Sequence, residues 1–281
     1  MTHIKAFFDF IRWKNLLIIA LTQFVVRLFL VGCDSYLTCL LDFRFNILVL
    51  STLLIAAAGY VINDYFDVKI DLINKPNEVY IGRFIKRRYA LLLHQTLSVI
   101  GVILAGILGY KTFLIAVFAV TLLWFYASIF KKKPFYGNLI VAGLTGLSLS
   151  ETAILFPDQS QVIHIYSLFA FFINLIREII KDIEDIKGDK MYGATTLPIV
   201  WGIRKTKKLL FALIGAFCVL VCVLSYPLHN KTLWFIFSLL GVVLIYITIL
   251  LVSADRKSHF SRISKWCKWL MVMGVASMMV L

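Results

Sequence analysis

Long apolar runs recur along this chain and leave it few folds to choose from. Several runs hold roughly 18 or more residues with almost no charge, the length that an α-helix needs to cross a bilayer. Apolar residues make up 61% of the sequence, and the mean hydropathy is +0.89. We therefore expect an all-α, polytopic membrane protein with about nine transmembrane helices, at residues 16–33, 44–62, 89–109, 112–130, 138–156, 161–180, 207–227, 232–253 and 266–281.

The basic residues give these spans an orientation. With the N-terminus inside, 25 of the 29 Lys and Arg residues fall in segments on the cytoplasmic side, whereas the outside loops hold only Arg44, Lys111 and Lys231. An excess of Lys and Arg on one side is typical of the cytoplasmic loops of membrane proteins. A net charge of +14 could also suggest nucleic-acid binding, but the cations lie between the spans and not on one face or tail. We expect no nucleic-acid partner.

The cysteines and the N-terminal segment predict no further site or processing step. Five cysteines show neither a C-x-x-C pair nor a metal-type spacing with histidines, so no disulfide framework is expected. Cys218 and Cys222 lie one helical turn apart in an apolar run and are expected to pack there. The N-terminal segment has no small-residue cleavage site and does not read as a removed signal peptide. We expect a single membrane-embedded domain over residues 1–281.

Two acidic segments stand out, each at the end of an apolar run. Residues 63–71 read NDYFDVKID and residues 181–189 read KDIEDIKGD, with 118 positions between Asp64 and Asp182. At about 100° per residue, Asn63, Asp64, Asp67 and Asp71 fall within one arc of a helix. Both segments follow even-numbered spans, so both are expected to open on the cytoplasmic side. Each continues to a proline, Pro76 or Pro198, and repeated halves of four spans could bring the two together over one cavity.

The aspartates of the two segments, if they gather at the membrane surface, repel one another unless cations lie between them. Carboxylates without His or Cys favour Mg²⁺, which takes one or two carboxylates and completes its shell with water and substrate phosphates. The sequence thus predicts a di- or polyphosphate substrate. The alternative is that the acids only end helices and pair with Lys69, Lys181 and Lys187, but two similar clusters on one side of the membrane favour the metal site.

At these residues the chain resembles the UbiA superfamily of intramembrane prenyltransferases. Asn63, Asp64, Asp67 and Asp71 match that family's N-D-x-x-D-x-x-x-D motif, and Asp182, Asp185 and Asp189 match its second motif, D-x-x-D-x-x-x-D. The resemblance implies helices around a central cavity and transfer of an isoprenoid chain from its diphosphate to an acceptor. It also implies Mg²⁺ as cofactor, bridging the diphosphate and the six aspartates, with Asp64, Asp67, Asp182 and Asp185 as the main catalytic metal carriers.

Further polar residues are candidates for substrate binding. Asn174, Glu178 and Lys181 share the acidic stripe of the sixth span, with Arg177 beside it, and polar groups at membrane depth usually face a cavity or a partner. We favour a lining role for Asn174 and Glu178 over an internal structural pair. The family's Y-x-x-x-K arrangement has a counterpart one residue longer, in Tyr126 and Lys131. An arginine usual after the first motif is missing, and Arg83 could supply its phosphate contact.

The sequence leaves the identity of the acceptor open. The amino-acid sequence around the second motif looks most like that of the geranylgeranylglycerol-phosphate geranylgeranyltransferase branch, whose acceptor is a lipid such as geranylgeranylglyceryl phosphate. Prenylation of an aromatic acid in quinone or pigment biosynthesis is the alternative within the family. From another class, a membrane transporter predicts acids near the bilayer midplane and broken helices there, whereas these aspartates cluster at one surface. A purely structural membrane protein predicts no metal dependence.

Overall fold

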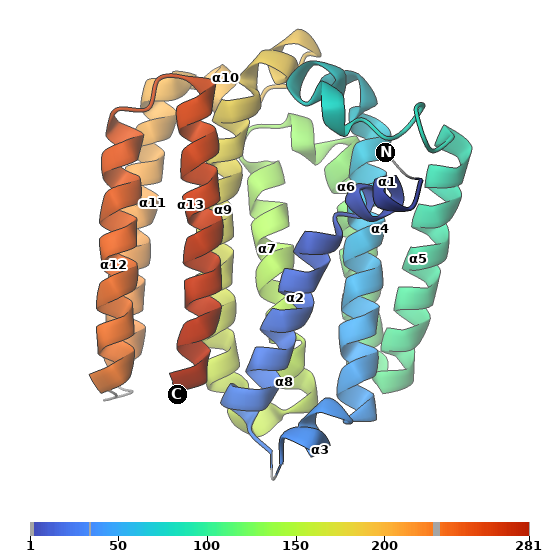
Figure 1. Ribbon diagram of the computed structural model, residues 1–281, viewed down its shortest axis with the longest axis vertical. Helices are drawn as coiled ribbons and strands as arrows, with labels where there is room; N and C mark the ends of the chain where they lie inside the picture. The colour runs from blue at the N-terminus through green and yellow to red at the C-terminus, as the bar shows by residue number, and fades with distance from the viewer. Residues whose placement is uncertain (1–2, 34, 227–230, 281) are drawn as a thin grey trace.

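The computed structural model describes residues 3–33, 35–226 and 231–280, and Figure 1 shows a bundle of long helices whose axes run roughly parallel. Within this part of the chain, eight helices are long and apolar enough to cross a membrane. The helical elements are α1 (His3–Phe10), α2 (Trp13–Val25), η1 (Val26–Val31), α3 (Tyr36–Leu40), α4 (Phe43–Asn74), η2 (Pro76–Glu78), α5 (Arg87–Leu108), α6 (Tyr110–Ser128), η3 (Phe130–Lys132), α7 (Tyr136–Ser150), α8 (Thr152–Leu155), η4 (Pro157–Gln159), α9 (Ser160–Met191), α10 (Leu197–Val200), α11 (Gly202–Ser225), α12 (Lys231–Val252), α13 (Lys257–Ser277) and η6 (Met278–Val280).

The expected helical membrane fold is confirmed, and the count of spans is approximately right. The predicted ninth span coincides with α13, which packs against α9 and α12 but begins with several charged residues, among them Lys257, Arg262 and Lys265. For that reason α13 is not among the eight helices apolar enough to span. The predicted span ends at residues 227 and 281 lie outside the described residues.

Helices α4 and α9 form the centre of the bundle and are longer than the predicted spans. Asp42 caps the start of α4 by accepting a hydrogen bond from the Phe45 N–H at 3.1 Å, and Pro76 follows its end. Each helix has 32 residues, so each continues through its acidic motif as an unbroken helix. Both end at the same side of the bundle, at the top of Figure 1, and α3 lies at the opposite side.

Small residues allow close packing around α4. A Cβ on Gly101 of α5 would lie 2.7 Å from the Ile55 side chain, and Ser51 donates a hydrogen bond to the Gly101 carbonyl at 2.8 Å. Close approach of this kind is how membrane helices gain van der Waals contact. It fixes α4 against α5 and so fixes the direction of the first acidic motif.

The first span accommodates its polar residues through specific partners. Gln23 is buried and donates to Thr52 at 3.2 Å and to the Ser148 carbonyl at 2.8 Å. Arg27 pairs with Asp42 at 3.2 Å and lies over the Phe156 ring. These contacts give partners to the Gln23 amide N–H and the Arg27 guanidinium, which would otherwise be costly in lipid, although Gln23 Oε1 and Arg27 Nε stay without a partner among the described residues.

The prediction that no disulfide forms is wrong. Cys33 and Cys39 are joined in a disulfide that links the end of η1 to α3. The two cysteines are six positions apart, a spacing without a recognisable pattern, and only the connection between α2 and α4 brings them together. Of the two cysteines expected to pack in α11, Cys218 is half-buried whereas Cys222 is exposed.

Candidate active site

The two acidic motifs meet where α4 and α9 end. The Asn74 side chain at the end of α4 donates to the Asp185 carbonyl at 3.1 Å and accepts a hydrogen bond from the Gly188 N–H at 3.0 Å. The amide thus ties the last turn of one motif helix to the other, across 111 and 114 positions of sequence. This junction is the meeting of the two segments that the sequence suggested.

Lys131 lies between the motifs. Its ammonium donates to Asn63 Oδ1 at 3.0 Å and forms an ion pair with Asp67. It also lies within electrostatic range of Asp71 and, on the second motif, Asp189. Burial is the largest single influence on the pKa of Lys131 and lowers it, but the charge of Asp67, its hydrogen bond and the neighbouring Tyr126 and Asp71 together raise that pKa above its ordinary value. Lys131 is therefore a permanent cation that faces both motifs.

The turn that carries Lys131 is held on two sides. A Cβ on Gly137, in the first turn of α7, would lie 3.1 Å from the Lys131 Cα and 3.3 Å from the Tyr126 ring, so glycine allows α7 to pack tightly there. The Lys132 carbonyl accepts hydrogen bonds from Thr195 N at 2.7 Å and Thr195 Oγ1 at 2.9 Å. Thr195 follows α9, so the segment after the second motif fixes the turn in place.

Arg12 occupies the outer edge of the first motif. Its guanidinium donates to Asp64 Oδ1 at 2.6 Å and stacks over the Tyr60 ring, 5.0 Å from the centroid. Burial is the largest single influence on the pKa of Arg12 and lowers it, yet the charge and hydrogen bond of Asp64, together with Tyr60 and Asp71, raise the pKa overall. Helix α1, which precedes Arg12, lies beside α4 at this end of the bundle (Figure 1).

The second motif is bound by different partners. Asn138 on α7 donates to Asp182 Oδ2 at 2.8 Å, and the Lys75 ammonium lies 3.8 Å from Asp185 Oδ2. The other oxygen of Asp185, Oδ1, is buried without a hydrogen-bond partner among the described residues. An unpaired buried carboxylate oxygen is costly and needs a ligand or a cation.

The other residues predicted to bind substrate differ in the contacts that they make. Glu178 pairs with Arg177 at 2.7 Å and with Lys181 at 3.3 Å, and Tyr126 lies within electrostatic range of Lys131, Asp67 and Asp182. Asn174 is buried and donates to Thr145 Oγ1 at 2.7 Å, so its amide has a partner within the bundle, and its role in lining a substrate pocket stays a prediction. Arg83 is exposed and donates to the Pro76 carbonyl at 2.8 Å, so its side chain is engaged with the loop after α4.

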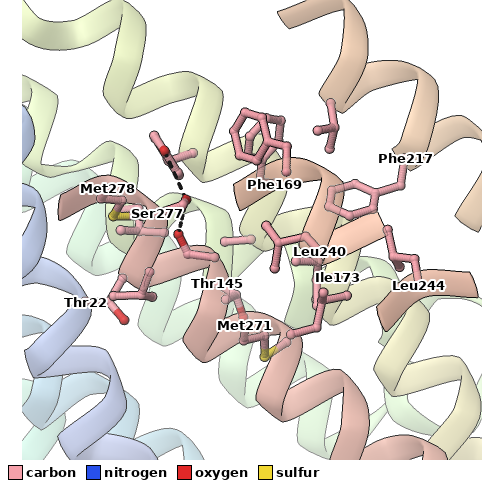
Figure 2. Close-up of a pocket in the computed structure, with 18 of the residues that line it drawn as sticks. Thr22, Thr145, Phe169, Ile173, Phe217, Leu240, Leu244, Met271, Ser277 and Met278 are labelled. Carbon is pink, nitrogen blue, oxygen red and sulfur yellow. Dashed lines mark hydrogen bonds between the residues drawn. The ribbon is translucent and has the colours of Figure 1, made fainter. Parts of the chain in front are cut away.

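A large apolar cavity lies deeper in the bundle. It has a volume of about 420 Å³ and is lined from α2, α7, α9, α11, α12 and α13 (Figure 2), with Phe169, Ile173, Phe217, Leu240 and Leu244 among its walls. Asp182 lies nine residues after Ile173 on α9, which corresponds to about 14 Å along the helix axis. The acidic end of the bundle therefore stands above an apolar chamber.

No three acidic, His or Cys side chains in the described part of the chain converge closely enough to hold a metal ion by themselves. Arg12, Lys75, Lys131 and Asn138 instead contact the aspartates. The donor set nevertheless suits a hard cation, because it consists of carboxylates and includes the unpaired Asp185 Oδ1. Such an ion would need phosphate oxygens from a substrate to complete its shell.

Residues 38–271 match the model of the UbiA prenyltransferase family. The chain belongs to the UbiA prenyltransferase family. Its relatives in this family include the digeranylgeranylglyceryl phosphate synthase of Thermococcus sibiricus, which is 36% identical over 73% of this chain and 72% of that protein.

Solved structures agree with this UbiA assignment. One, described as giving structural and mechanistic insights into digeranylgeranylglyceryl phosphate synthase in membranes, has a TM-score of 0.72 and 26% identity over 100% of this chain and 98% of the other. A UbiA homologue from Archaeoglobus fulgidus, bound to GPP and Mg²⁺, has a TM-score of 0.66 and 16% identity over 97% and 99% of the two chains. This UbiA prenyltransferase is an integral membrane enzyme, and a transporter is no longer a competing reading.

Sequence reasoning missed several partners of the acids. Arg12 counted only as an inside-loop cation, and Asn138, Asn74 and Lys75 were not expected to contact the second motif. A single Asn or Lys far along the sequence carries no spacing signal, so these contacts become visible only in the folded chain. The six motif aspartates themselves were predicted from their spacing.

Proposed function

We propose that this enzyme transfers a geranylgeranyl group from its diphosphate to geranylgeranylglyceryl phosphate and releases pyrophosphate, with Mg²⁺ as cofactor. The observation that carries the proposal is the meeting of two acidic motifs around Lys131, at the end of a bundle that contains an apolar cavity of about 420 Å³. The name of the Thermococcus sibiricus relative supports the lipid acceptor. The Archaeoglobus fulgidus homologue, bound to GPP and Mg²⁺, supports the donor and the metal.

Asp64, Asp67, Asp71, Asp182, Asp185 and Asp189 would hold the magnesium ions, and Asn63 would support them. When bound, Mg²⁺ supplies positive charge that binds the diphosphate and stabilises it as a leaving group. The unpaired Oδ1 of Asp185 is available for this role without breaking an existing hydrogen bond. Arg12 and Lys131 pair with Asp64 and Asp67, so those two carboxylates would have to give up a protein cation in order to hold a metal ion.

The residues of the chain itself then provide positioning and charge. Lys131 lies between the two motifs and, once released from Asp67, would stabilise the negative charge that develops on the diphosphate as the bond from C1 to oxygen breaks. The electron pair of that bond stays with pyrophosphate, and the acceptor hydroxyl oxygen attacks the allylic cation at C1 and loses its proton. The apolar chamber holds prenyl chain and excludes water, which would otherwise capture the cation.

We also propose that the acidic end of the bundle faces the cytoplasm. The motif ends of α4 and α9 are flanked by basic residues, among them Lys75, Lys131, Lys187 and Lys190, as the positive-inside rule expects for this side. The Cys33–Cys39 disulfide lies at the other side of the bundle, and an external location suits a disulfide.

The proposal is tested by incubating purified enzyme with labelled geranylgeranyl diphosphate and a panel of acceptors, with Mg²⁺ or with a chelator. The panel contains geranylgeranylglyceryl phosphate and several aromatic acids. We expect a labelled lipid product that requires Mg²⁺. A labelled aromatic product would keep the reaction and overturn the acceptor, and absence of product with every acceptor would overturn the proposed function.

A further inference from the structure

Helix α9 presents two chemically different flanks at the acidic end. Asp182 faces Asn138 of α7, and Asp189 interacts with Lys131. At about 100° per residue, Arg177 and Lys181 lie roughly 80–140° away from these two aspartates around the helix, whereas Asp185 is only about 40–80° from the two cations. The pair of cations therefore faces different neighbours from Asp182 and Asp189, and Asp185 lies between the two flanks.

The second flank gathers cations. Lys181 lies close enough to Arg177, Lys75 and Arg12 for their charges to repel it, and Glu178 is the acid that pairs with both Arg177 and Lys181. Lys75 and Arg12 pair with Asp185 and Asp64. In these ion pairs four cations share three carboxylates, so among the described residues the cations outnumber the acids paired directly with them.

One donor of this basic cluster, defined by Arg177, Lys181 and Lys75, lacks a partner. Arg177 Nε is buried and has no hydrogen-bond partner among the described residues. A buried guanidinium N–H without an acceptor is costly. Because guanidinium groups bind phosphate oxygens in a forked geometry, the free Nε and the Lys181 ammonium together suit a phosphate group.

The proposed reaction brings two phosphate-bearing lipids to the acidic end of the bundle, and the aspartates with their metal ions can bind the phosphates of only one of them. A diphosphate can bind among six aspartates because metal ions bridge the like charges. A phosphate monoester, with a charge of about −1.5 to −2, needs cations that the acids do not neutralise. The cluster of Arg177, Lys181 and Lys75, whose cations outnumber the acids paired directly with them, lies beside the motifs and meets this need.

We propose that the basic cluster of Arg177, Lys181 and Lys75 binds the phosphate monoester of the acceptor lipid, whereas Lys131 serves the donor diphosphate. This assignment rests on the proposed function. It predicts that the enzyme recognises the acceptor by its phosphate and that this recognition is separable from binding of the donor.

The test compares geranylgeranylglyceryl phosphate with geranylgeranylglycerol, which lacks the phosphate, as acceptors for wild type, Arg177→Gln and Lys181→Gln. The matched control is Lys187→Gln, because Lys187 is exposed on the same helix and makes none of the ion pairs of the cluster. In the two cluster variants we expect the KM for the phosphorylated acceptor to rise about tenfold or more, as for loss of a charged hydrogen bond. The KM for the donor should stay within about twofold, and the preference for the phosphorylated acceptor should largely disappear.

A rise in the donor KM that equals or exceeds the rise in the acceptor KM would assign the cluster to the diphosphate and overturn the proposal. Arg177→Lys and Lys181→Arg keep the charge and should recover part of the acceptor affinity, which separates lost binding from misfolding. If wild type makes no product, the proposed function has failed. Thermal stabilisation of the purified protein by geranylgeranylglyceryl phosphate then tests the cluster alone, and equal stabilisation of Lys181→Gln and wild type would overturn it.

Discussion

Lys131 links Asn63 and Asp67 of the first motif to the region of Asp189 in the second. Its raised pKa keeps it protonated at any working pH, so it acts through charge and not through proton transfer. We expect Lys131→Met to lower kcat/KM by about 100-fold or more, as removal of a donor to a developing anion does. Steady-state kinetics measure this loss.

The matched control is Lys132→Met, because the exposed Lys132 contributes its backbone carbonyl to the Thr195 contact and keeps that carbonyl in the variant. Its activity should stay near wild type. Equal losses in the two variants would mean that general charge at the mouth, and not the position of Lys131, is what matters.

Asn138 orients Asp182 through a hydrogen bond of 2.8 Å. A hydrogen bond to a charged group contributes about 1.5–3 kcal/mol, so we expect Asn138→Ala to lower kcat/KM by roughly tenfold or more. The Mg²⁺ concentration for half-maximal rate should rise as well, because the carboxylate loses its fixed orientation. A magnesium titration of purified variant and wild type checks both, and an unchanged titration would show that Asp182 needs no such support.

At the scale of single residues the sequence singles out the acids of the two motifs but not the side chains that contact them. Spacing on a helix identifies Asp64, Asp67 and Asp71 as one face, since the period of a helix is fixed. The contact of Arg12 with Asp64 depends on where α1 and α2 meet α4, which no local pattern encodes. Lys131 was predicted because of a family motif, although that motif is one residue longer here.

The junction of α4 and α9 depends on one glycine and one amide. A Cβ at Gly188 would lie 2.5 Å from the Asn74 side chain, so Gly188→Ala must displace the amide that ties the two helices. We expect the free energy of unfolding to fall by about 1–3 kcal/mol, as for other overpacked sites, and the activity to fall with it. Thermal unfolding in detergent and the prenyl-transfer rate measure the two effects.

The control is Gly215→Ala on α11, where a Cβ would meet nothing within 4 Å. This substitution should leave activity unchanged and raise stability by about 0.5–1 kcal/mol, because alanine restricts the unfolded chain more than glycine does. If Gly188→Ala behaved like Gly215→Ala, the junction would not hold the motifs together.

Helix boundaries were harder to predict than helix existence. Hydropathy ends the second span near residue 62, yet α4 continues to Asn74, because the charged residues of the motif are compatible with a helix once it leaves the lipid. Hydropathy alone does not identify α13 as a span, because its first turns are basic, yet α13 packs along α9 and α12 as a full helix of the bundle. Boundaries of this kind depend on tertiary contacts, which override local polarity.

For the molecule as a whole, the basic asymmetry of the loops predicts which end faces the cytoplasm. In a cysteine-free background that retains activity, a single cysteine at Lys187 should react with a membrane-impermeant maleimide only after the membrane is opened. One at exposed Leu37 of α3 should react in intact cells. The reverse pattern would place the acidic end outside and contradict the orientation.

Fold class and the number of long helices follow from composition and length, because a bilayer admits few alternatives to a helical bundle. The cavity of about 420 Å³ does not follow in the same way. Its walls come from six helices distributed over the chain, and apolar residues that line it look the same in the sequence as those that face lipid. Long-range packing of this kind cannot be read from hydropathy.

The most direct test of the account is the transfer of labelled geranylgeranyl from its diphosphate to the lipid acceptor by wild type and Asp64→Ala, with Mg²⁺ and with a chelator. Asp64→Ala should insert into the membrane and elute as wild type does on size exclusion. We expect Mg²⁺-dependent product from wild type and none above background from the variant. Full activity in Asp64→Ala, or equal activity with chelator, would contradict the assignment of the acidic motifs as the metal-dependent catalytic centre.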